Sequence, residues 1–286
     1  MKYIDLHVHS NASDGTLTPS EVVDHAVSLS LSAFALTDHD TLNGIAEAKE
    51  RAAWHTARGN QIEVYSGVEI SAAYKNRDIH ILGLLVDEEN ELLRMTLEKA
   101  VQNRDARNHK MLERFADLGI SLSMEDLYGD CPDTVITRAH FARALVAKGI
   151  VSSLSEAFEL YLNHSAPCYV SREYPSPEQA VSLILKAGGV PVLAHPLLYD
   201  LPHEELLSLI ERLKKAGLAG IEVFYSTNRG QDEATLKALA SHFSLVMTGG
   251  SDFHGAAKPS IELGYGKGNL KIPYSVLEHV KEAKRT

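Results

Sequence analysis

Short runs of β-branched and apolar residues alternate with longer amphipathic segments along most of the chain. This alternation is typical of β/α units arranged around a parallel sheet or barrel. Seven strands are predicted, which is close to the number that closes a barrel. They are Tyr3–Val8, Ala33–Thr37, Glu63–Ile70, Ile79–Val86, Val190–Ala194, Gly220–Phe224 and Leu245–Thr248.

The amphipathic segments between these strands predict helices. Thr18-Pro19-Ser20-Glu21 is a helix start, because Thr18 can cap the first turn and proline is favoured at the first helical position. Further helices are expected over Asn43–Thr56, Pro177–Ala187, His203–Ala216, Gln231–His242 and Tyr274–Ala283.

Residues 90–167 depart from the alternation, because they form a series of helical segments with no convincing strand. These segments are Glu91–Leu118, Ser123–Tyr128, Arg138–Lys148 and Leu154–Leu162. The sequence therefore predicts an α/β barrel domain over residues 1–89 and 168–286, with an all-helical insert domain over residues 90–167. We expect the insert at one end of the barrel, where long connections often form lids or substrate walls.

Composition narrows the class of protein. With 286 residues, 44% of them hydrophobic, the chain can bury a full core. No apolar run is long enough to cross a bilayer, and polar residues interrupt the start of the chain, so we expect a cytoplasmic protein without a membrane partner. Cys131 and Cys168 are too few for a disulfide framework and lack the spacing of a thiolate metal site.

The net charge of −10 argues against a surface that tracks long duplex nucleic acid. Small anionic substrates remain compatible with this charge if bound cations reverse the local field. Nothing in the sequence indicates an obligate protein partner.

Histidine and acidic residues are clustered near both ends of the chain. His7 and His9 lie two residues apart in a predicted strand, so their imidazoles point the same way, with Asp5 one step behind on that face. Ser251-Asp252-Phe253-His254 forms a second cluster near the other end. The first of these geometries suits a metal ion.

Further candidate ligands follow other predicted strands. His39, Glu69 and His195 lie at strand ends, where β/α barrels assemble their active sites. His80 begins a strand, so it reaches the same rim only if that strand runs in a suitable direction. Taken singly, each pattern is also compatible with turn chemistry or a core histidine, but their joint occurrence favours a metal site.

The motifs DLHVHS, SDGTLTP, TDHD, GVEI, HILG, AHP and GGSDFHG occur in an order that resembles the PHP (polymerase and histidinol phosphatase) family of metal-dependent phosphoesterases. The resemblance implies a distorted seven-stranded (β/α) barrel that holds about two or three divalent ions. Some family members have a histidine where Asp14 stands. That difference, like the helical insert, resembles the stand-alone branch that includes nucleoside 3′,5′-bisphosphate phosphatases and 5′-to-3′ exoribonucleases.

The resemblance also implies which residues bind each ion. The first ion would be held by His7, His9, Glu69 and Asp252, the second by Glu69, His80 and His195, and the third by Asp14, His39 and His254. Glu69, Asp252 and His254 are the candidate catalytic residues among them. Asp5, Asp38 and Asp40 are candidates for orienting the imidazoles from behind, and Asp40 is also a candidate ligand.

Phosphate-ester chemistry agrees with such a ligand set. Hydrolysis needs a nucleophile at neutral pH and neutralisation of the charge on the phosphoryl oxygens. Clustered dications supply both through a metal-activated hydroxide, and a bridging carboxylate such as Glu69 would set their spacing at about 3.5–4 Å. Mixed imidazole and carboxylate ligands suit Mn²⁺, Fe²⁺ or Zn²⁺ better than Mg²⁺.

Substrate recognition is expected outside the metal shell. Arg138 and His140 begin a helix of the insert, and Arg172 lies where the chain re-enters the barrel. A guanidinium makes fork-like contacts to phosphate, although a solvated surface arginine is the alternative for each. In the resembled branch, such basic residues bind a phosphate of the substrate.

Three functions remain open at this point. The first is hydrolysis of phosphate monoesters of nucleotides, of the 3′,5′-bisphosphate type, or of the 5′ ends of short oligonucleotides. The second is a phosphatase or cyclic phosphodiesterase for another small metabolite, such as histidinol phosphate or a sugar phosphate. The third is a non-catalytic metal-binding module, which is disfavoured because every expected ligand position is filled.

Overall fold

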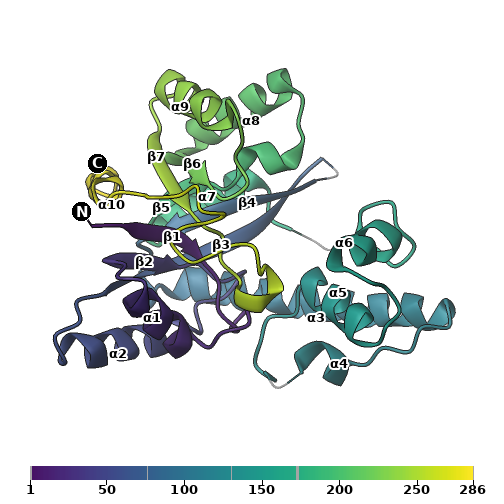
Figure 1. Cartoon of the computed structure of the whole chain (residues 1–286). Coiled ribbons are helices and arrows are strands. Elements are labelled where there is room, and N and C mark those ends of the chain that lie inside the picture. Colours follow the sequence, from purple (N-terminus) through teal and green to yellow (C-terminus); the bar gives the residue numbers. More distant parts are fainter. Residues whose placement is uncertain (1, 76, 130, 172–173, 286) are drawn as a thin grey trace.

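The computed structural model describes residues 2–75, 77–129, 131–171 and 174–285. Its centre is a seven-stranded sheet whose strands neighbour one another in sequence order, from β1 to β7. They are β1 (Ile4–Val8), β2 (Ala33–Leu36), β3 (Glu63–Tyr74), β4 (Arg77–Leu84), β5 (Val190–Leu193), β6 (Gly220–Tyr225) and β7 (Val246–Gly250). The sheet curls until the segment after β7 meets β1, where Val8 pairs with Phe253 (Figure 1). The predicted distorted seven-stranded barrel is confirmed.

One strand runs against the others. β4 is antiparallel to both β3 and β5, whereas the remaining neighbours pair in parallel. Tyr74 at the end of β3 pairs with Arg77 at the start of β4, and so short a connection allows only an antiparallel pair. β3 and β4 are also longer at this hairpin than the expected Glu63–Ile70 and Ile79–Val86. His80 therefore lies near the same rim as the C-terminal ends of the parallel strands.

Helices cover the outside of the barrel. α1 (Pro19–Ser28) begins with the expected signature, because Thr18 and Glu21 form a reciprocal capping box ahead of Pro19. The other barrel helices are α2 (Ile45–Thr56), α7 (Pro177–Lys186), α8 (His203–Ala216), α9 (Asp232–His242) and α10 (Ser275–Ala283). Two 3₁₀ turns, η2 (Pro196–Tyr199) and η3 (Gly255–Ala257), follow β5 and β7.

The insert consists of helices gathered on one side of the barrel (Figure 1). They are α3 (Glu91–Asp117), α4 (Met124–Tyr128), α5 (Arg138–Ala147), α6 (Leu154–Ala157) and the π-helical turn η1 (Phe158–Leu162). The insert has a hydrophobic cluster of its own, in which the rings of Phe115 and Phe141 stack at 5.9 Å. The first turns of α3 instead pack Leu93 and Leu97 into the cluster beneath α7 and α8. The domain boundaries at residues 90 and 167 stay a prediction.

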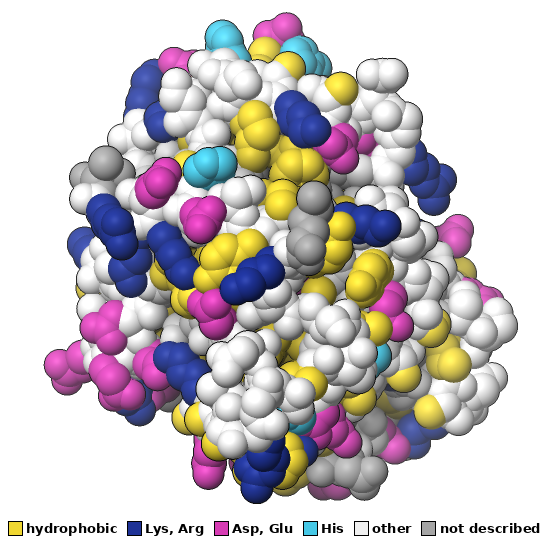
Figure 2. Space-filling view, turned by 60° about the vertical axis from the view of Figure 1, so that its left-hand side comes forward, with side chains coloured by type: hydrophobic (Ala, Val, Ile, Leu, Met, Phe, Trp, Pro, Cys, Tyr) yellow, Lys and Arg dark blue, Asp and Glu magenta, His cyan; other side chains and the backbone are white. Residues whose placement is uncertain are grey.

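The surface carries charges of both signs. On the face shown in Figure 2, Lys and Arg side chains lie among Asp and Glu side chains and small apolar patches. None of the helices in the described ranges is long and apolar enough to cross a membrane. The cytoplasmic location stays a prediction.

Candidate active site

His7 and His9 on and just after β1 begin the site. Their Nε2 atoms lie 3.1 Å apart, and each is within 3.3 Å of Glu69 Oε2. The alternation of a strand thus places both imidazoles on one face, as expected. Gly250 allows this arrangement, because a Cβ atom at that position would collide with the backbone of His7.

Glu69 lies at the centre of the site, inside β3 and not at its end. Its Oε1 atom is 2.8 Å from His80 Nδ1 and 3.0 Å from His195 Nε2. Its Oε2 atom is 3.2 Å from His39 Nδ1. Both carboxylate oxygens therefore face imidazoles from several strands, which is the geometry that a bridging ligand needs.

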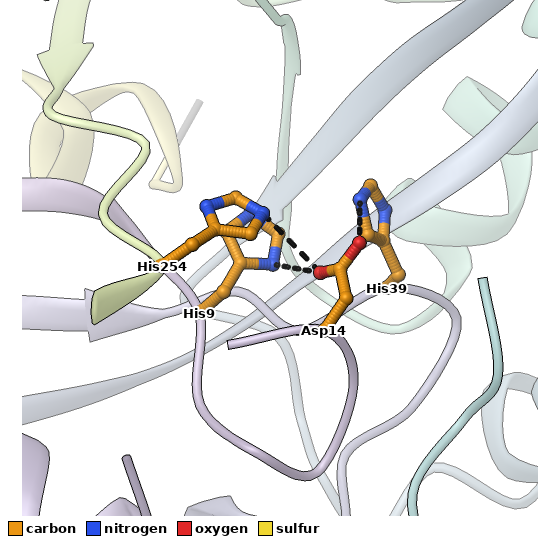
Figure 3. A group of neighbouring side chains, drawn as sticks. All are labelled: His9, Asp14, His39 and His254. Atoms are coloured by element: carbon orange, nitrogen blue, oxygen red, sulfur yellow. Dashed lines mark ion pairs between the residues drawn. The ribbon is translucent and has the colours of Figure 1, made fainter. Parts of the chain in front are cut away.

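Asp14 gathers a second group of imidazoles, which come from separate segments (Figure 3). Its Oδ1 atom lies 3.2 Å from His254 Nε2 and 3.9 Å from His9 Nδ1, and its Oδ2 atom lies 3.8 Å from His39 Nε2. The insert holds this carboxylate in place, since the Thr137 hydroxyl donates to Asp14 Oδ2 at 2.9 Å. The barrel and the insert thus build this part of the site together.

The two carboxylate oxygens of Asp252 contact different groups. Oδ1 lies 3.4 Å from both His9 Nε2 and His254 Nδ1. Oδ2 accepts hydrogen bonds from the Tyr225 hydroxyl and from Lys258 Nζ, each at 2.6 Å. One oxygen therefore faces the imidazole cluster and the other is held by two donors.

The carboxylates behind the cluster have other partners than expected. Asp5 accepts from the amides of Ser251 (2.9 Å) and Gly264 (2.7 Å), and Asp38 accepts from the amide and hydroxyl of Ser10 (2.8 and 2.7 Å). In these contacts Asp5 and Asp38 hold loops, and Asp5 Oδ1 also accepts from the backbone amide of His7 at 3.2 Å. Their role in orienting the imidazoles stays a prediction.

Glu222 on β6 orients His7, and the sequence prediction missed it. Glu222 Oε1 lies 3.0 Å from His7 Nδ1, and Oε2 accepts from the backbone amide of His195 at 2.8 Å. Its side chain is fully buried. A lone carboxylate within the apolar strand Gly220–Tyr225 was the available signal, because such a residue is rarely buried without a partner.

Asp40 is tied to the insert. Its Oδ2 atom accepts from Arg104 Nε at 2.9 Å and from Arg104 Nη2 at 2.6 Å, and its Oδ1 atom accepts from the Ser71 amide at 2.9 Å. Both oxygens accept hydrogen bonds, and the candidate ligand role of Asp40 stays a prediction. The pair links α3 to the turn that carries His39.

The charges in the cluster favour a cation. Burial alone would raise the pKa of Glu69, but the imidazoles around it outweigh burial and hold that pKa well below its ordinary range. Burial lowers the pKa of His39 to about 3, so this ring is neutral. Burial also acts to lower the pKa of His9, but its bonds to Asp252 and Glu69 raise it to about 9. The ionised Glu69 carboxylate and the neutral His39 imidazole are in the form that binds metal, whereas His9 would have to release its proton when an ion binds.

The donor set fits divalent metal ions. Three groups of side chains bring their potential ligand atoms within 4.8 Å of one another. They are His7, His9 and Glu69; His39, Glu69 and His80; and His9, Asp14, His39 and His254. In the described part of the chain, buried atoms without a hydrogen-bond partner include His9 Nδ1, Asp14 Oδ1, His39 Nδ1 and His80 Nδ1. Metal coordination would satisfy such atoms. The assignment of individual ligands to three ions stays a prediction.

A cavity of about 370 Å³ opens on this cluster. His39, His80, His254 and Asp14 line it together with basic side chains of the insert and of the loop after β7. The basic residues are Arg104, Arg107, Arg138, Arg143 and Lys258. Apart from Arg138, they were not singled out from the sequence, because only folding brings α3, α5 and the loop after β7 to one hollow.

The expected substrate residues have different positions. Arg138 lines the cavity, where its guanidinium pairs with Asp78. His140 does not line it, because its Nδ1 atom accepts from the Thr137 amide at 3.1 Å to cap α5. Burial lowers the pKa of His140 to about 3, so its ring is neutral. Its role in substrate binding stays a prediction. Arg172 lies outside the described residues.

Comparison with known proteins agrees with this site. Residues 5–166 match the PHP domain family. A 3′,5′-nucleoside bisphosphate phosphatase of Chromobacterium violaceum is 37% identical over 274 residues, which covers 93% of this chain and 92% of that protein. The 5′-3′ exoribonuclease Rnm of Escherichia coli is 36% identical over 260 residues, covering 91% and 87% of the two chains.

Solved structures show the same likeness. An amidohydrolase from Chromobacterium violaceum with bound sulfate and no metal has a TM-score of 0.87 and 35% identity, covering 98% of this chain and 96% of that one. A protein classed as a metal-dependent phosphoesterase, from Bifidobacterium adolescentis, has a TM-score of 0.86 and 29% identity, covering 99% and 96%. Fold and site thus define a phosphoric ester hydrolase, as predicted. The chain belongs to the PHP domain family.

Proposed function

We propose that the protein hydrolyses phosphate monoesters of nucleotides, of the 3′,5′-bisphosphate type, or the 5′ ends of short oligonucleotides. The observation that carries the proposal is one cavity lined both by the imidazoles His39, His80 and His254 and by the guanidinium groups of Arg107 and Arg138. A substrate with two phosphates suits this lining, because one can meet the metal centre while the arginines bind the other. The names of the two relatives support the same substrate class.

Two to three divalent ions of manganese, iron or zinc would complete the site. Their proposed ligands are His7, His9, Asp14, His39, Glu69, His80, His195, Asp252 and His254. When bound, such ions supply a nucleophile from water at neutral pH and neutralise charge on the phosphoryl oxygens. Glu222 would keep the Nδ1 proton of His7, so that Nε2 faces the centre as a ligand.

A panel of phosphate esters tests the function after reconstitution with Mn²⁺. We expect the highest kcat/KM for a nucleoside 3′,5′-bisphosphate or a short 5′-phosphorylated oligonucleotide. A preference for histidinol phosphate, a sugar phosphate or a cyclic phosphate would support the small-metabolite alternative. Absence of hydrolysis by fully metal-loaded protein would support the non-catalytic alternative.

The role of Arg138 is tested by comparing two substrates. Arg138→Ala should weaken binding of a nucleoside 3′,5′-bisphosphate by about 2–3 kcal/mol, because a charge-assisted contact to the uncleaved phosphate is lost. A 5′-monophosphate should suffer much less, and metal content should stay at the wild-type level. Arg212→Ala is the matched control, since Arg212 also pairs with a carboxylate, that of Glu178, but does not line the cavity.

An equal loss for both substrates would mean that Arg138 contacts the scissile phosphate or acts through folding. No loss for either substrate would remove Arg138 from the recognition site, and the small-metabolite alternative would gain.

A further inference from the structure

Lys258 reaches the site from the turn that follows β7. Its ammonium group donates to Asp252 Oδ2 at 2.6 Å, and the Tyr225 hydroxyl donates to the same oxygen at 2.6 Å. The other oxygen of Asp252 faces His9 and His254. Tyr225 by itself is a neutral donor that would leave Oδ2 satisfied, so hydrogen bonding alone does not require a cation here.

A positive charge at this place is unfavourable for metal binding. Asp252 is a proposed ligand, and an ammonium in contact with it repels any cation held by its other oxygen. The same charge becomes favourable when an anion binds next to both the Lys258 ammonium and the metal ions, because the anion then contacts positive charge on two sides. An anionic substrate group therefore explains the position of Lys258, whereas the metal ions alone do not.

The side chain of Lys258 is placed to meet such an anion. Lys258 lines the cavity together with His39, His80 and His254, and its side chain is 38% exposed. An ammonium has three N–H donors, of which one is directed to Asp252, so further donors remain for a ligand in the cavity. Arg138 also lines this cavity, but its guanidinium forms an ion pair with Asp78, which is another lining residue.

We propose that Lys258 is a catalytic residue that binds a non-bridging oxygen of the phosphoryl group being cleaved. The inference rests on the proposed function. In the hydrolysis, a water oxygen forms the new bond to phosphorus, the P–O ester bond breaks, and the leaving alcohol oxygen takes the proton that the water loses. Lys258 stays protonated throughout and stabilises the charge that builds up on the phosphoryl oxygens.

The test compares Lys258→Met and Lys258→Arg with Lys267→Met, a substitution of an exposed lysine that does not line the cavity. Metal content, kcat for a phosphate monoester and the Kd of inorganic phosphate for the Mn²⁺-loaded protein are measured on each. For Lys258→Met we expect undiminished metal content, a kcat about a hundredfold to a thousandfold lower, and phosphate binding about tenfold weaker. Lys258→Arg should recover part of both losses, and Lys267→Met should match the wild type.

The proposal is overturned if Lys258→Met keeps kcat and phosphate affinity within about threefold of the wild type. It is also overturned if the variant loses metal in proportion to rate, since Lys258 would then act by holding Asp252. Failure of the proposed function looks different, because wild-type protein with full metal content would then hydrolyse none of the esters. In that case the phosphate Kd still decides the role of Lys258, and equal values for wild type and Lys258→Met would reject it.

Discussion

At the scale of single residues, Glu69 is the carboxylate at the centre of the candidate metal site. Its buried carboxylate lies within 3.3 Å of imidazoles that come from β1, β4 and the ends of β2 and β5. Such a group loses its function when its charge is removed, even if its shape is kept, because a neutral amide cannot bridge two cations.

Glu69→Gln should therefore lose most of the hydrolytic activity and at least part of the bound metal. His242→Gln, at the exposed end of α9, should change neither quantity. Metal content by elemental analysis and kcat/KM for a phosphate monoester check both variants. Equal effects of the two substitutions would overturn the proposed role of Glu69.

At the scale of elements, a buried ion pair joins the insert to the barrel. Arg104 on α3 is 5% exposed and Asp40, after β2, is 1% exposed. Arg104 Nη2 also donates to the Ser71 hydroxyl on β3 at 2.9 Å. The position of His39 at the site thus depends on a helix that lies far from it in sequence.

Arg104→Met should lower the free energy of unfolding of the metal-free protein by about 3–5 kcal/mol, because the carboxylate of Asp40 is left buried without its cation. Lys215→Met, which breaks the exposed pair with Glu211 on α8, should cost less than about 0.5 kcal/mol. Denaturant unfolding measures both. A similar small cost for the two variants would show that the Asp40–Arg104 pair contributes little to stability.

At the scale of the whole molecule, metal and stability should be coupled. The ligand groups come from both ends of the chain and from the strands between, so only the folded protein presents them together. Purified protein is expected to hold about two to three equivalents of transition metal, and chelation should abolish hydrolysis. Restoring free metal to about a thousandfold above its Kd should stabilise the fold by about 4 kcal/mol for each independent site and raise Tm.

Calorimetric melting with and without chelator checks the stability, and elemental analysis checks the stoichiometry. Less than about one equivalent after growth with added Mn²⁺, Fe²⁺ or Zn²⁺ would contradict the proposed centre. An unchanged Tm on chelation would show that this cluster of side chains does not bind metal in the folded protein.

The positions of the strands and helices could be read from the sequence because they depend on local patterns. Alternating apolar residues marked each strand to within a few residues, and Thr18-Pro19-Ser20-Glu21 marked the start of α1. The face shared by His7 and His9 followed from strand geometry alone. Local periodicity is the same whichever way a strand pairs, so the direction of β4 and the reach of His80 to the site were left open.

By itself, the sequence determined the element order and the kinds of residue that can hold metal, because both are properties of neighbouring positions. The tertiary structure decided which carboxylate orients which imidazole. Glu222 and His7 are 215 positions apart, and no local pattern relates them. The tertiary structure also pairs Asp40 with Arg104 and makes His140 part of the cap of α5. It brings Lys258 and Arg107 to one cavity. These contacts depend on how distant elements pack, which sequence-local patterns do not specify.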